Sequence, residues 1–224
     1  MLNIALSGAS GKMGESILAV AEADPDVNII CKLTRNNKEL LKPIDIFIDF
    51  STPSACQEYL IICQKLKIPM VIGTTGLSTR QYQGIIKASE IIPILYAPNM
   101  SIGVNICYML LENLSNKWSY YFPQSQTVDI LEVHHKHKKD APSGTALKMA
   151  EIIAQYNLKV NFTSKRIGEI KGKHQVSFDN SFEKIIIKHQ VKDRKVFAKG
   201  ALLAAKWLIK QSEKLYSFSD LLSS

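Results

Sequence analysis

The first hundred residues alternate short apolar segments with segments of helical periodicity, and this alternation leaves few folds open to the chain. The apolar segments are continuously rather than alternately apolar, as in strands that are covered on both faces of a sheet. Strands joined by single helices form a parallel sheet with right-handed crossovers. The sequence therefore predicts a Rossmann-like, doubly wound α/β sheet. The expected strands are Leu2–Ser7, Val27–Leu33, Ile44–Phe50, Pro69–Gly73 and Ile92–Tyr96, and the expected helices are Lys12–Ala23, Pro53–Leu66 and Ser78–Ser89.

From Ser101 onward the pattern changes, which indicates a second region with its own sheet. Its later strand-like segments are typical of an antiparallel or mixed sheet. We therefore expect a smaller α+β domain after the first hundred residues. Its strands are expected at Thr127–His134, Val160–Ile167, His174–Phe178 and Phe182–Gln190, and its helices at Ile102–Trp118 and from Ser143 to about Tyr156. The chain is expected to close with a further helix at Val196–Gln211.

A glycine-rich loop follows the first expected strand and leads into the first helix, which is the position of a dinucleotide-binding fingerprint. Its spacing is G-x-x-G-x-x-G instead of the common G-x-G-x-x-G. Gly8 permits a tight turn, Gly11 lets the backbone approach a pyrophosphate, and Gly14 lets helix and strand pack closely. A glycine turn without a ligand is the alternative. The predicted cofactor contacts here are Gly8, Ala9, Ser10, Gly11, Lys12 and Met13.

The coenzyme preference is predicted from the end of the second strand. Proteins that bind NAD commonly carry an acidic residue there, about 20 residues after the glycine loop. This chain has Thr34 and Arg35 instead, and a guanidinium suits the 2′-phosphate of NADPH. We expect NADPH to be used at least as well as NADH, with Arg35 as a cofactor contact; a solvated surface arginine is the alternative. The segment from Thr34 to Pro43 is too short for a normal crossover helix.

Histidine and lysine side chains crowd the segment from His134 to Lys139, directly before a Pro-Ser-Gly-Thr sequence that indicates the start of a helix. Ser143 can cap this helix, and the first N–H groups of Gly144 and Thr145 then face an anion. Imidazoles exchange protons near neutral pH. The segment therefore predicts a site for an acidic small molecule.

The segment Glu-x-His-His-x-x-Lys-x-Asp-Ala-Pro-Ser-Gly-Thr-Ala at 132–146 resembles the signature of the 4-hydroxy-tetrahydrodipicolinate reductase (dihydrodipicolinate reductase) family, which acts in the diaminopimelate route to lysine. The match has no gap. The chain departs from the family at Asp129, where glutamate is usual, and in the stretch after Leu33, which is shorter than usual.

The resemblance implies reduction of a cyclic dicarboxylate imine by NADPH or NADH with loss of water. It assigns His134 as the proton donor and Lys138 as a second acid that also holds the charged ring. It further implies that His135, Gly144 and Thr145 bind the substrate carboxylates, with Arg194 as a weaker candidate. The segments implied to line the nicotinamide side of the cofactor are Gly73, Thr74 and Thr75, and Ala97, Pro98, Asn99 and Met100.

The resemblance also implies how the domains are organised. The last helix is expected to return to the first domain, so that residues 1–100 and 195–224 form the dinucleotide-binding domain. Residues 101–194 are then the substrate-binding and oligomerisation domain. A homotetramer is expected, assembled through the sheet at Lys171–Gln190.

Charge, hydrophobicity and the placement of histidines and cysteines limit which partners, compartments and metals are expected. The net charge of +8 admits nucleic acid as a partner, but the lysines are spread along the chain without an aromatic-interleaved basic motif, so we expect none. No apolar run reaches the length of a membrane span, and no signal peptide precedes the first strand, so a cytoplasmic protein is expected. No metal is expected, because His134, His135 and His137 cannot easily face one ion. The thiols are expected to be reduced core residues: Cys31, Cys56, Cys63 and Cys107.

Two other functions remain open at this level. Another two-domain dehydrogenase, acting on an amino acid or a semialdehyde, would share the first domain but leaves the His-Lys segment unexplained. A regulatory protein that senses the nucleotide without turnover is favoured only by the short stretch after Leu33.

Overall fold

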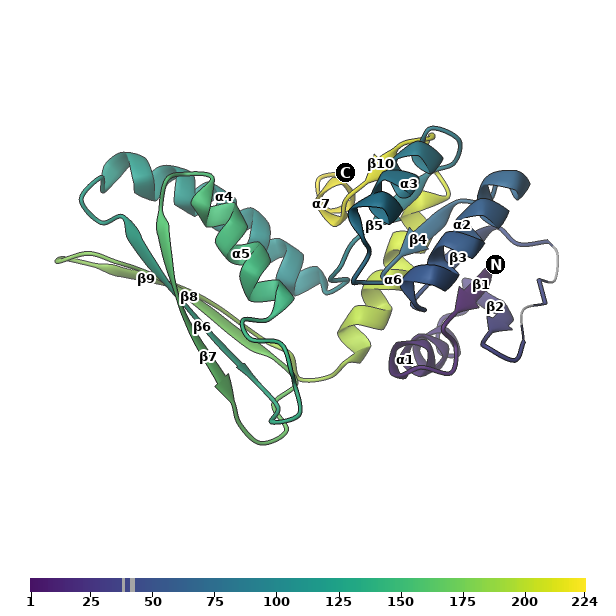
Figure 1. Ribbon diagram of the computed structural model, residues 1–224, viewed down its shortest axis with the longest axis horizontal. Helices are drawn as coiled ribbons and strands as arrows, with labels where there is room; N and C mark the ends of the chain where they lie inside the picture. The colour runs from purple at the N-terminus through teal and green to yellow at the C-terminus, as the bar shows by residue number, and fades with distance from the viewer. Residues whose placement is uncertain (38, 41–42) are drawn as a thin grey trace. The chain divides into compact units, whose positions relative to one another are not determined.

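The computed structural model describes residues 1–37, 39–40 and 43–224. These residues divide into two compact units (Figure 1). Unit 1 comprises Met1–Ile102 and Arg194–Ser224, and unit 2 comprises Gly103–Asp193. The functional roles that the sequence suggests for the domains stay predictions. Across the described ranges, no helix is both long and apolar enough to cross a lipid bilayer.

Unit 1 is built on a six-stranded sheet in which every neighbouring pair of strands is parallel. The strand order is β10-β5-β4-β3-β1-β2, so the direction of winding reverses between β2 and β3. The carboxyl ends of β1 and β3 flank this reversal, which is where ligands bind in open α/β sheets. The strands are β1 Leu2–Ser7, β2 Val27–Leu33, β3 Ile46–Asp49, β4 Met70–Ile72, β5 Ile94–Tyr96 and β10 Leu215–Tyr216.

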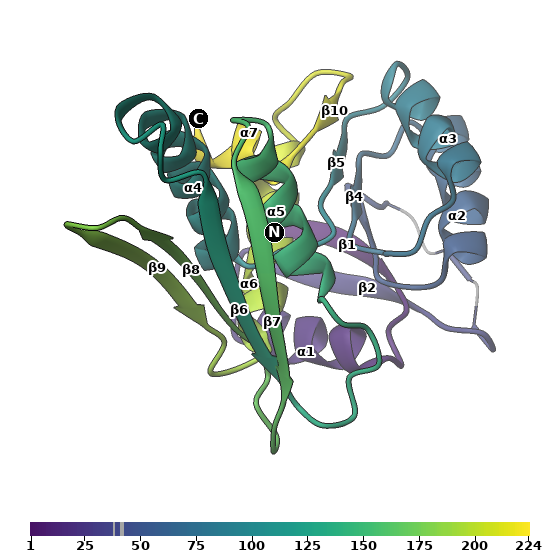
Figure 2. The same ribbon diagram turned by 60° about the vertical axis from the view of Figure 1, so that its left-hand side comes forward.

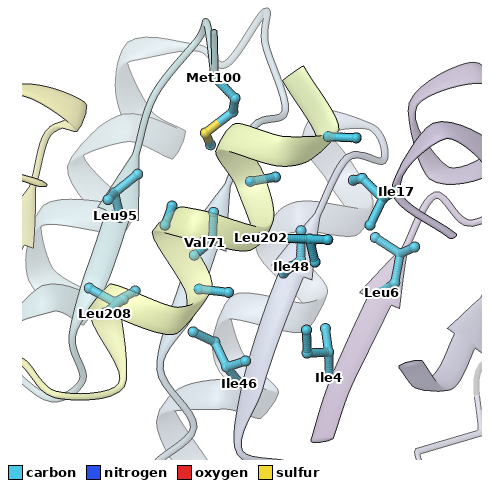
Figure 3. Close-up of a cluster of buried hydrophobic side chains, with 14 of the residues drawn as sticks. Ile4, Leu6, Ile17, Ile46, Ile48, Val71, Leu95, Met100, Leu202 and Leu208 are labelled. Carbon is cyan, nitrogen blue, oxygen red and sulfur yellow. The ribbon is translucent and has the colours of Figure 1, made fainter. Parts of the chain in front are cut away.

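Helices cover both faces of this sheet and bury a hydrophobic core on each side. Helices α1 and α6 contribute Ile17 and Leu202 to the core shown in Figure 3. Helices α2 and α3 contribute Tyr59 and Ile85 to the other core. Strand residues alternate between the two cores, which explains why the strands are apolar at every position. The helices of unit 1 are α1 Lys12–Ala21, α2 Pro53–Leu66, α3 Thr79–Ser89, α6 Lys195–Leu208 and α7 Phe218–Leu222.

The starts of α2 and α3 are fixed by local sequence. The hydroxyl of Thr52 accepts a hydrogen bond from the backbone N–H of Ala55, and a proline follows at the first helical position. Ser78 and Gln81 form a capping box at the start of α3. Each cap satisfies N–H groups that the helix itself leaves without partners.

Unit 2 contains a four-stranded mixed sheet in the order β7-β6-β8-β9. Strand β6 pairs in parallel with β7 and antiparallel with β8, which pairs antiparallel with β9. Helices α4 and α5 lie against one face of the sheet (Figure 2), where Trp118, Val128 and Phe178 belong to a third buried core. The elements are α4 Ile102–Tyr121, β6 Thr127–His134, α5 Gly144–Ala154, β7 Lys159–Arg166, β8 Lys173–Asp179 and β9 Lys184–Gln190.

The predicted fold class, a Rossmann-like parallel sheet with a smaller mixed-sheet domain, is confirmed. The expected strands and helices are present, with ends that differ by up to a few residues. The prediction was wrong in ending the secondary structure at the last long helix, because β10 and α7 follow it. Strand β10 is too short for a sequence pattern and is defined by its pairing with β5. The segment predicted to be abbreviated includes residues 38, 41 and 42, which lie outside the described residues.

Candidate functional site

The glycine loop of unit 1 adopts the tight turn that the sequence predicts. Gly8 follows β1 with a φ of 74°, and a Cβ there would lie 2.1 Å from the carbonyl oxygen of Phe50. A Cβ at Gly14 would lie 2.2 Å from the carbonyl oxygen of Gly8, so helix α1 packs directly on the loop. Helix α1 begins after Gly11 without a side-chain cap. Its first N–H groups are therefore not claimed by a capping side chain, which suits an anion.

A pocket of about 370 Å³ lies beside this loop within unit 1. It brings together the first turn of α1 and the loops that follow β3, β4 and β5. Half of the predicted cofactor residues line it, whereas Gly8–Lys12, Arg35 and Ala97 do not. The predicted residues in its lining are Met13, Gly73, Thr74, Thr75, Pro98, Asn99 and Met100.

Three lining residues were not predicted from the sequence: Phe50, Ser51 and Phe197. Phe50 and Ser51 directly follow β3, so the rule that ligands bind at the carboxyl ends of parallel strands could have found them. Phe197 belongs to α6, nearly 100 residues beyond the other lining segments, and no local pattern marks it. Helix α6 reaches this place because Gly200 allows it to pack against the carbonyl oxygen of Met100.

A buried carboxylate ties the loops around the pocket together. Asp49 ends β3 with no exposed surface and accepts hydrogen bonds from three hydroxyl groups. One comes from Ser7 at the end of β1. The others come from Ser51 at 2.5 Å and from Thr74 at 2.6 Å. The ends of β1 and β3 and the loop after β4 therefore share one acceptor, which fixes their relative positions.

The residues expected to select the coenzyme form a turn after β2. The hydroxyl of Thr34 accepts the backbone N–H groups of Asn36 and Asn37, at 3.3 and 3.1 Å. Arg35 lies at this turn with an exposed side chain. Arg35 does not line the pocket of unit 1, so its part in cofactor binding stays a prediction.

Together these features of unit 1 fit a dinucleotide. The turn at Gly8 and the close packing at Gly14 exclude side chains, and the uncapped start of α1 provides N–H groups for a pyrophosphate. The pocket continues from Met13 of α1 to the loops after β4 and β5, which gives a planar ring a place beside the sheet.

The second candidate site lies in unit 2, where β6 ends at His134. Glu132 and His134 are both buried, and the Nδ1 atom of His134 contacts the Oε2 atom of Glu132. The other carboxylate oxygen of Glu132 lies 2.8 Å from Nη1 of Arg166, on the neighbouring strand β7. Burial tends to raise the pKa of Glu132, but its contacts with Arg166, Ser164 and His134 outweigh this and hold the pKa below its usual range.

Lys138 and His135 lie in the loop after β6. The Nζ atom of Lys138 is 2.7 Å from Oδ1 of Asp140, and about a quarter of the lysine side chain (23%) is exposed. The backbone N–H of Lys138 donates to the carbonyl of His135, which closes a turn. His135 is half-buried, and its ring lies 6.3 Å from that of His137. His135, predicted to bind substrate, and Lys138, predicted to act as an acid, therefore lie in the loop that directly follows His134.

The predicted helix start at Ser143 is confirmed. The hydroxyl of Ser143 accepts the backbone N–H of Ala146 at 3.3 Å and also lies 3.0 Å from Nε2 of His174 on β8. Gly144 is exposed at the first turn, and the side chain of Thr145 contacts Tyr108 of α4. Gly144 and Thr145 thus lie at a helix N-terminus, a place that suits an anion, and their part in substrate binding stays a prediction.

The structure also identifies three buried residues whose ligand atoms lie within 4.8 Å of one another: Glu132, His134 and His174. This group differs from the three neighbouring histidines weighed in the sequence. Glu132 is already paired with the guanidinium of Arg166, and that positive charge opposes a cation. We therefore assign no metal to the group.

Sequence reasoning missed Arg166 and His174 as neighbours of His134. Their positions follow from strand register: His134 pairs with Arg166, and Glu132 pairs with His174. The rings of His134 and His174 lie 5.1 Å apart. The available signal was the pair of polar residues Glu132 and His134, two positions apart at the end of β6, but their spacing does not reveal the register of the partner strands.

Comparisons with known proteins cover both units. Residues 2–100 match the family model described as dihydrodipicolinate reductase, N-terminus, and residues 103–222 match the model described as dihydrodipicolinate reductase, C-terminus. The chain is 37% identical over 257 residues to the 4-hydroxy-tetrahydrodipicolinate reductase of Pelagibacter ubique, covering 99% of this chain and 98% of the relative. It is 37% identical over 241 residues to that of Rickettsia rickettsii, covering 99% of each.

Solved structures agree in fold. A dihydrodipicolinate reductase from Paenisporosarcina sp. TG-14, solved with dipicolinate bound, superposes with a TM-score of 0.78 at 22% identity and covers 97% of both chains. A myo-inositol dehydrogenase from Corynebacterium glutamicum reaches 0.61 at 14% identity, over 100% of this chain and 93% of its own. These structural likenesses support the fold, and the sequence matches decide the family. The chain belongs to the dihydrodipicolinate reductase family.

Proposed function

We propose that this chain reduces 4-hydroxy-tetrahydrodipicolinate to tetrahydrodipicolinate, with loss of water, in the diaminopimelate route of lysine biosynthesis. One observation carries the proposal: the two family models together match the chain from residue 2 to residue 222, interrupted only at residues 101 and 102. Membership of this family implies a nicotinamide nucleotide as cofactor and a small-molecule substrate. The reduced nicotinamide, when bound, supplies a hydride to one ring carbon of the substrate.

His134 is proposed to donate the proton that the neighbouring ring carbon requires. Its Nδ1 atom is engaged by Glu132, so Nε2 is the atom that delivers the proton. The lack of a side chain at Gly172 keeps Nε2 uncrowded, because a Cβ at that glycine would lie only 3.2 Å from it, closer than an ordinary van der Waals contact. A positioned acid of this kind typically accelerates a reaction by about 10²- to 10⁴-fold.

Lys138 is proposed as a second acid and as a positive charge near the substrate ring. His135 and the backbone N–H groups of Gly144 and Thr145 are proposed to bind the substrate carboxylates. The support is that Gly144 and Thr145 occupy the first turn of α5, where the helix N-terminus favours negative charge. Arg194, which precedes α6, remains a further candidate for carboxylate binding.

A coupled assay tests the activity and the assigned roles. Substrate is formed in place from pyruvate and aspartate semialdehyde by the preceding synthase, and loss of reduced nicotinamide absorbance is followed. Wild-type protein is expected to turn over only when both precursors are present. His134→Gln and Lys138→Ala are expected to lower kcat by at least about tenfold. Lys139→Ala, which alters an exposed lysine in the same loop, is the matched control. Unchanged turnover in both test variants would refute the assigned roles.

NADPH is proposed to be used at least as well as NADH. The support is the cation at Arg35 beside a turn that carries no carboxylate at residues 34–37. Arg35→Ala is expected to lower the ratio of kcat/KM for NADPH to that for NADH by about tenfold, because it removes a charge-assisted contact. Lys32→Ala removes an exposed cation nearby and should leave the ratio unchanged. A wild-type preference for NADH would contradict the proposal.

A homotetramer assembled through the unit 2 sheet is proposed as well. Helices α4 and α5 cover one face of that sheet, and the edge strand β9 exposes half of the side chain of Ile186 (50%). Phe182, directly before β9, is almost fully exposed (97%). Sedimentation equilibrium is expected to give four times the chain mass, and Ile186→Lys is expected to reduce it. A monomer at micromolar concentration would contradict the proposal. A cytoplasmic location is proposed from the biosynthetic role and from the four buried cysteines, which form no disulfide among the described residues.

A further inference from the structure

A row of polar side chains crosses the unit 2 sheet on the face that also carries its hydrophobic core. Strand register aligns Ser164 of β7 with Glu132 of β6, and then His174 of β8 with His189 of β9. Two positions further along β6, His134 pairs with Arg166. The residues that precede Glu132 on this face, such as Ile130, are buried in the core. The core therefore ends at a line of polar side chains, most of which are ionisable.

Glu132 is the anion at the centre of this row. It has no exposed surface, and a buried carboxylate is costly unless positive or donating groups surround it. Its two oxygens are engaged by different partners, Oε2 by Nδ1 of His134 and Oε1 by the guanidinium of Arg166 at 2.8 Å. One carboxylate oxygen thus contacts the imidazole and the other contacts the guanidinium, so both partners are held by the same carboxylate.

Arg166 is itself held in place. Its Nη1 atom donates to the carbonyl of Lys165 at 2.8 Å, and Nη2 donates to the carbonyl of Asp140. Asp140 also accepts a hydrogen bond from Lys138. The guanidinium consequently connects the buried carboxylate to the loop that carries Lys138.

We infer that Glu132 and Arg166 are positioning residues, which fix the ring of His134 by its Nδ1–H and leave Nε2 to carry the proton to substrate. The inference rests on the proposed role of His134 as proton donor. Neither residue needs to touch substrate. Arg166 fixes the carboxylate of Glu132 by an ion pair, the carboxylate orients the imidazole of His134, and the imidazole donates the proton. In this arrangement the tautomer of His134 is set, because a carboxylate accepts a hydrogen bond only from a protonated Nδ1.

The charges around His134 make the inference measurable. Glu132 lies on the same strand, Arg166 on β7, His174 on β8, and Lys138 in the loop that follows. Burial lowers the pKa of His134, Lys138 and Arg166 act in the same direction, and Glu132 opposes them. Removal of the carboxylate charge should therefore lower the pKa of His134 further, so that less of the imidazolium is present at neutral pH.

Glu132→Gln is the decisive variant. At neutral pH we expect kcat to fall by at least about tenfold, within the range that a general acid contributes. KM for the reduced cofactor should change by less than about twofold, because the predicted cofactor contacts belong to unit 1. The loss of kcat should shrink as the pH is lowered. An NMR titration of the ring protons of His134 in the free enzyme should show its pKa decrease; a purely structural role for Glu132 does not predict this.

Asp129→Asn is the matched control. Asp129 is a carboxylate on the same strand, is exposed, and accepts a hydrogen bond from Asn161. Its replacement removes the same charge and should alter neither the pH profile nor the titration of His134. Equal effects of Asp129→Asn and Glu132→Gln would overturn the inference, since net charge alone would then explain them.

Glu132→Gln leaves the partly buried Arg166 without its anion, which would destabilise unit 2. The double variant Glu132→Gln/Arg166→Gln removes both charges and keeps two hydrogen-bonding side chains. If this folded protein, checked by circular dichroism, has the wild-type kcat and His134 titration, the inference is overturned. If the wild type fails to turn over the substrate while Glu132→Gln still lowers the pKa of His134, the proposed function fails and the placement of Glu132 stands.

Discussion

Two buried ionisable residues, Glu132 and His174, make unit 2 sensitive to acid. The pKa of Glu132 lies below its usual range, because its partners outweigh the cost of burial, so its contribution to stability is present above its unfolded pKa and is lost as the pH falls through the folded pKa. Burial lowers the pKa of His174 from 6.5 to about 4. As the pH falls, the unfolded chain therefore binds a proton at this histidine at a higher pH than the folded chain does. The free energy of unfolding decreases as the pH falls from about 6.5 to about 4.

The free energy of unfolding is expected to decrease by up to about 3 kcal/mol between pH 7 and pH 4 on account of His174 alone. His174→Gln should remove most of this slope, although it also replaces a ring nitrogen that contacts Ser143. Urea unfolding at a series of pH values measures the effect. The control His137→Gln alters a side chain that is largely exposed (70%) and should keep the wild-type slope. An unchanged slope in His174→Gln would contradict the assignment.

Among the elements, α6 combines an apolar face buried in the core of unit 1 with one very close approach to a neighbouring backbone. A Cβ at Gly200 would lie 1.7 Å from the carbonyl oxygen of Met100, which belongs to the loop that lines the pocket of unit 1. The contact is with backbone, so the neighbour cannot move aside as a flexible side chain can. Glycine is a poor helix former, and its presence here is explained by packing rather than by local propensity.

Gly200→Ala is expected to lower the free energy of unfolding by about 1–3 kcal/mol, despite the better helix propensity of alanine. It should also weaken cofactor binding, because the Pro98–Met100 segment must shift. Gly84→Ala in α3 is the matched control. A Cβ there would meet only the end of the Gln57 side chain, at 2.9 Å, so the change should be neutral or stabilising by up to about 1 kcal/mol. Thermal and urea unfolding compare the two, and equal effects would refute the argument.

The element predictions succeeded where local pattern and local contacts agree. The strands of unit 1 are apolar at every position because both faces of the sheet are covered. This continuous apolar pattern can be recognised from consecutive residues of the sequence. The start of α5 was predicted from Ser143, whose hydroxyl caps its own helix. Strand β10 carries no such signal. Its two residues, Leu215 and Tyr216, form a strand only because they pair with β5.

On the scale of the whole molecule, the two units have separate hydrophobic cores. The cores that enclose the unit 1 sheet draw on residues before 103 and after 193, and the unit 2 core draws on residues between them. A ligand that binds one unit should therefore stabilise that unit first. The proposed binding of the dinucleotide to unit 1 makes this testable.

NADPH at about 100 times its Kd is expected to add about 2.7 kcal/mol to the stability of unit 1. Hydrogen exchange followed by mass spectrometry should show slower exchange in β1, β4 and α1, with little change in β8 and β9. A cyclic dicarboxylate of the class proposed as substrate should instead slow exchange around the start of α5. Protection by NADPH that is confined to unit 2 would contradict the assignment of the cofactor to unit 1.

The sequence by itself determined the features that depend on neighbours within a few residues. These are the alternation of strands and helices, the turn at Gly8, the cap at Ser143, and the segment from Glu132 to Ala146 that identifies the family. Only the tertiary structure decided the rest: that Phe197 lines the pocket, and that Arg166 and His174 surround the Glu132–His134 pair. The physical reason is register. Side chains alternate along a strand, so a shift of one residue turns a partner to the other face, and no local pattern fixes which residues of distant strands become neighbours.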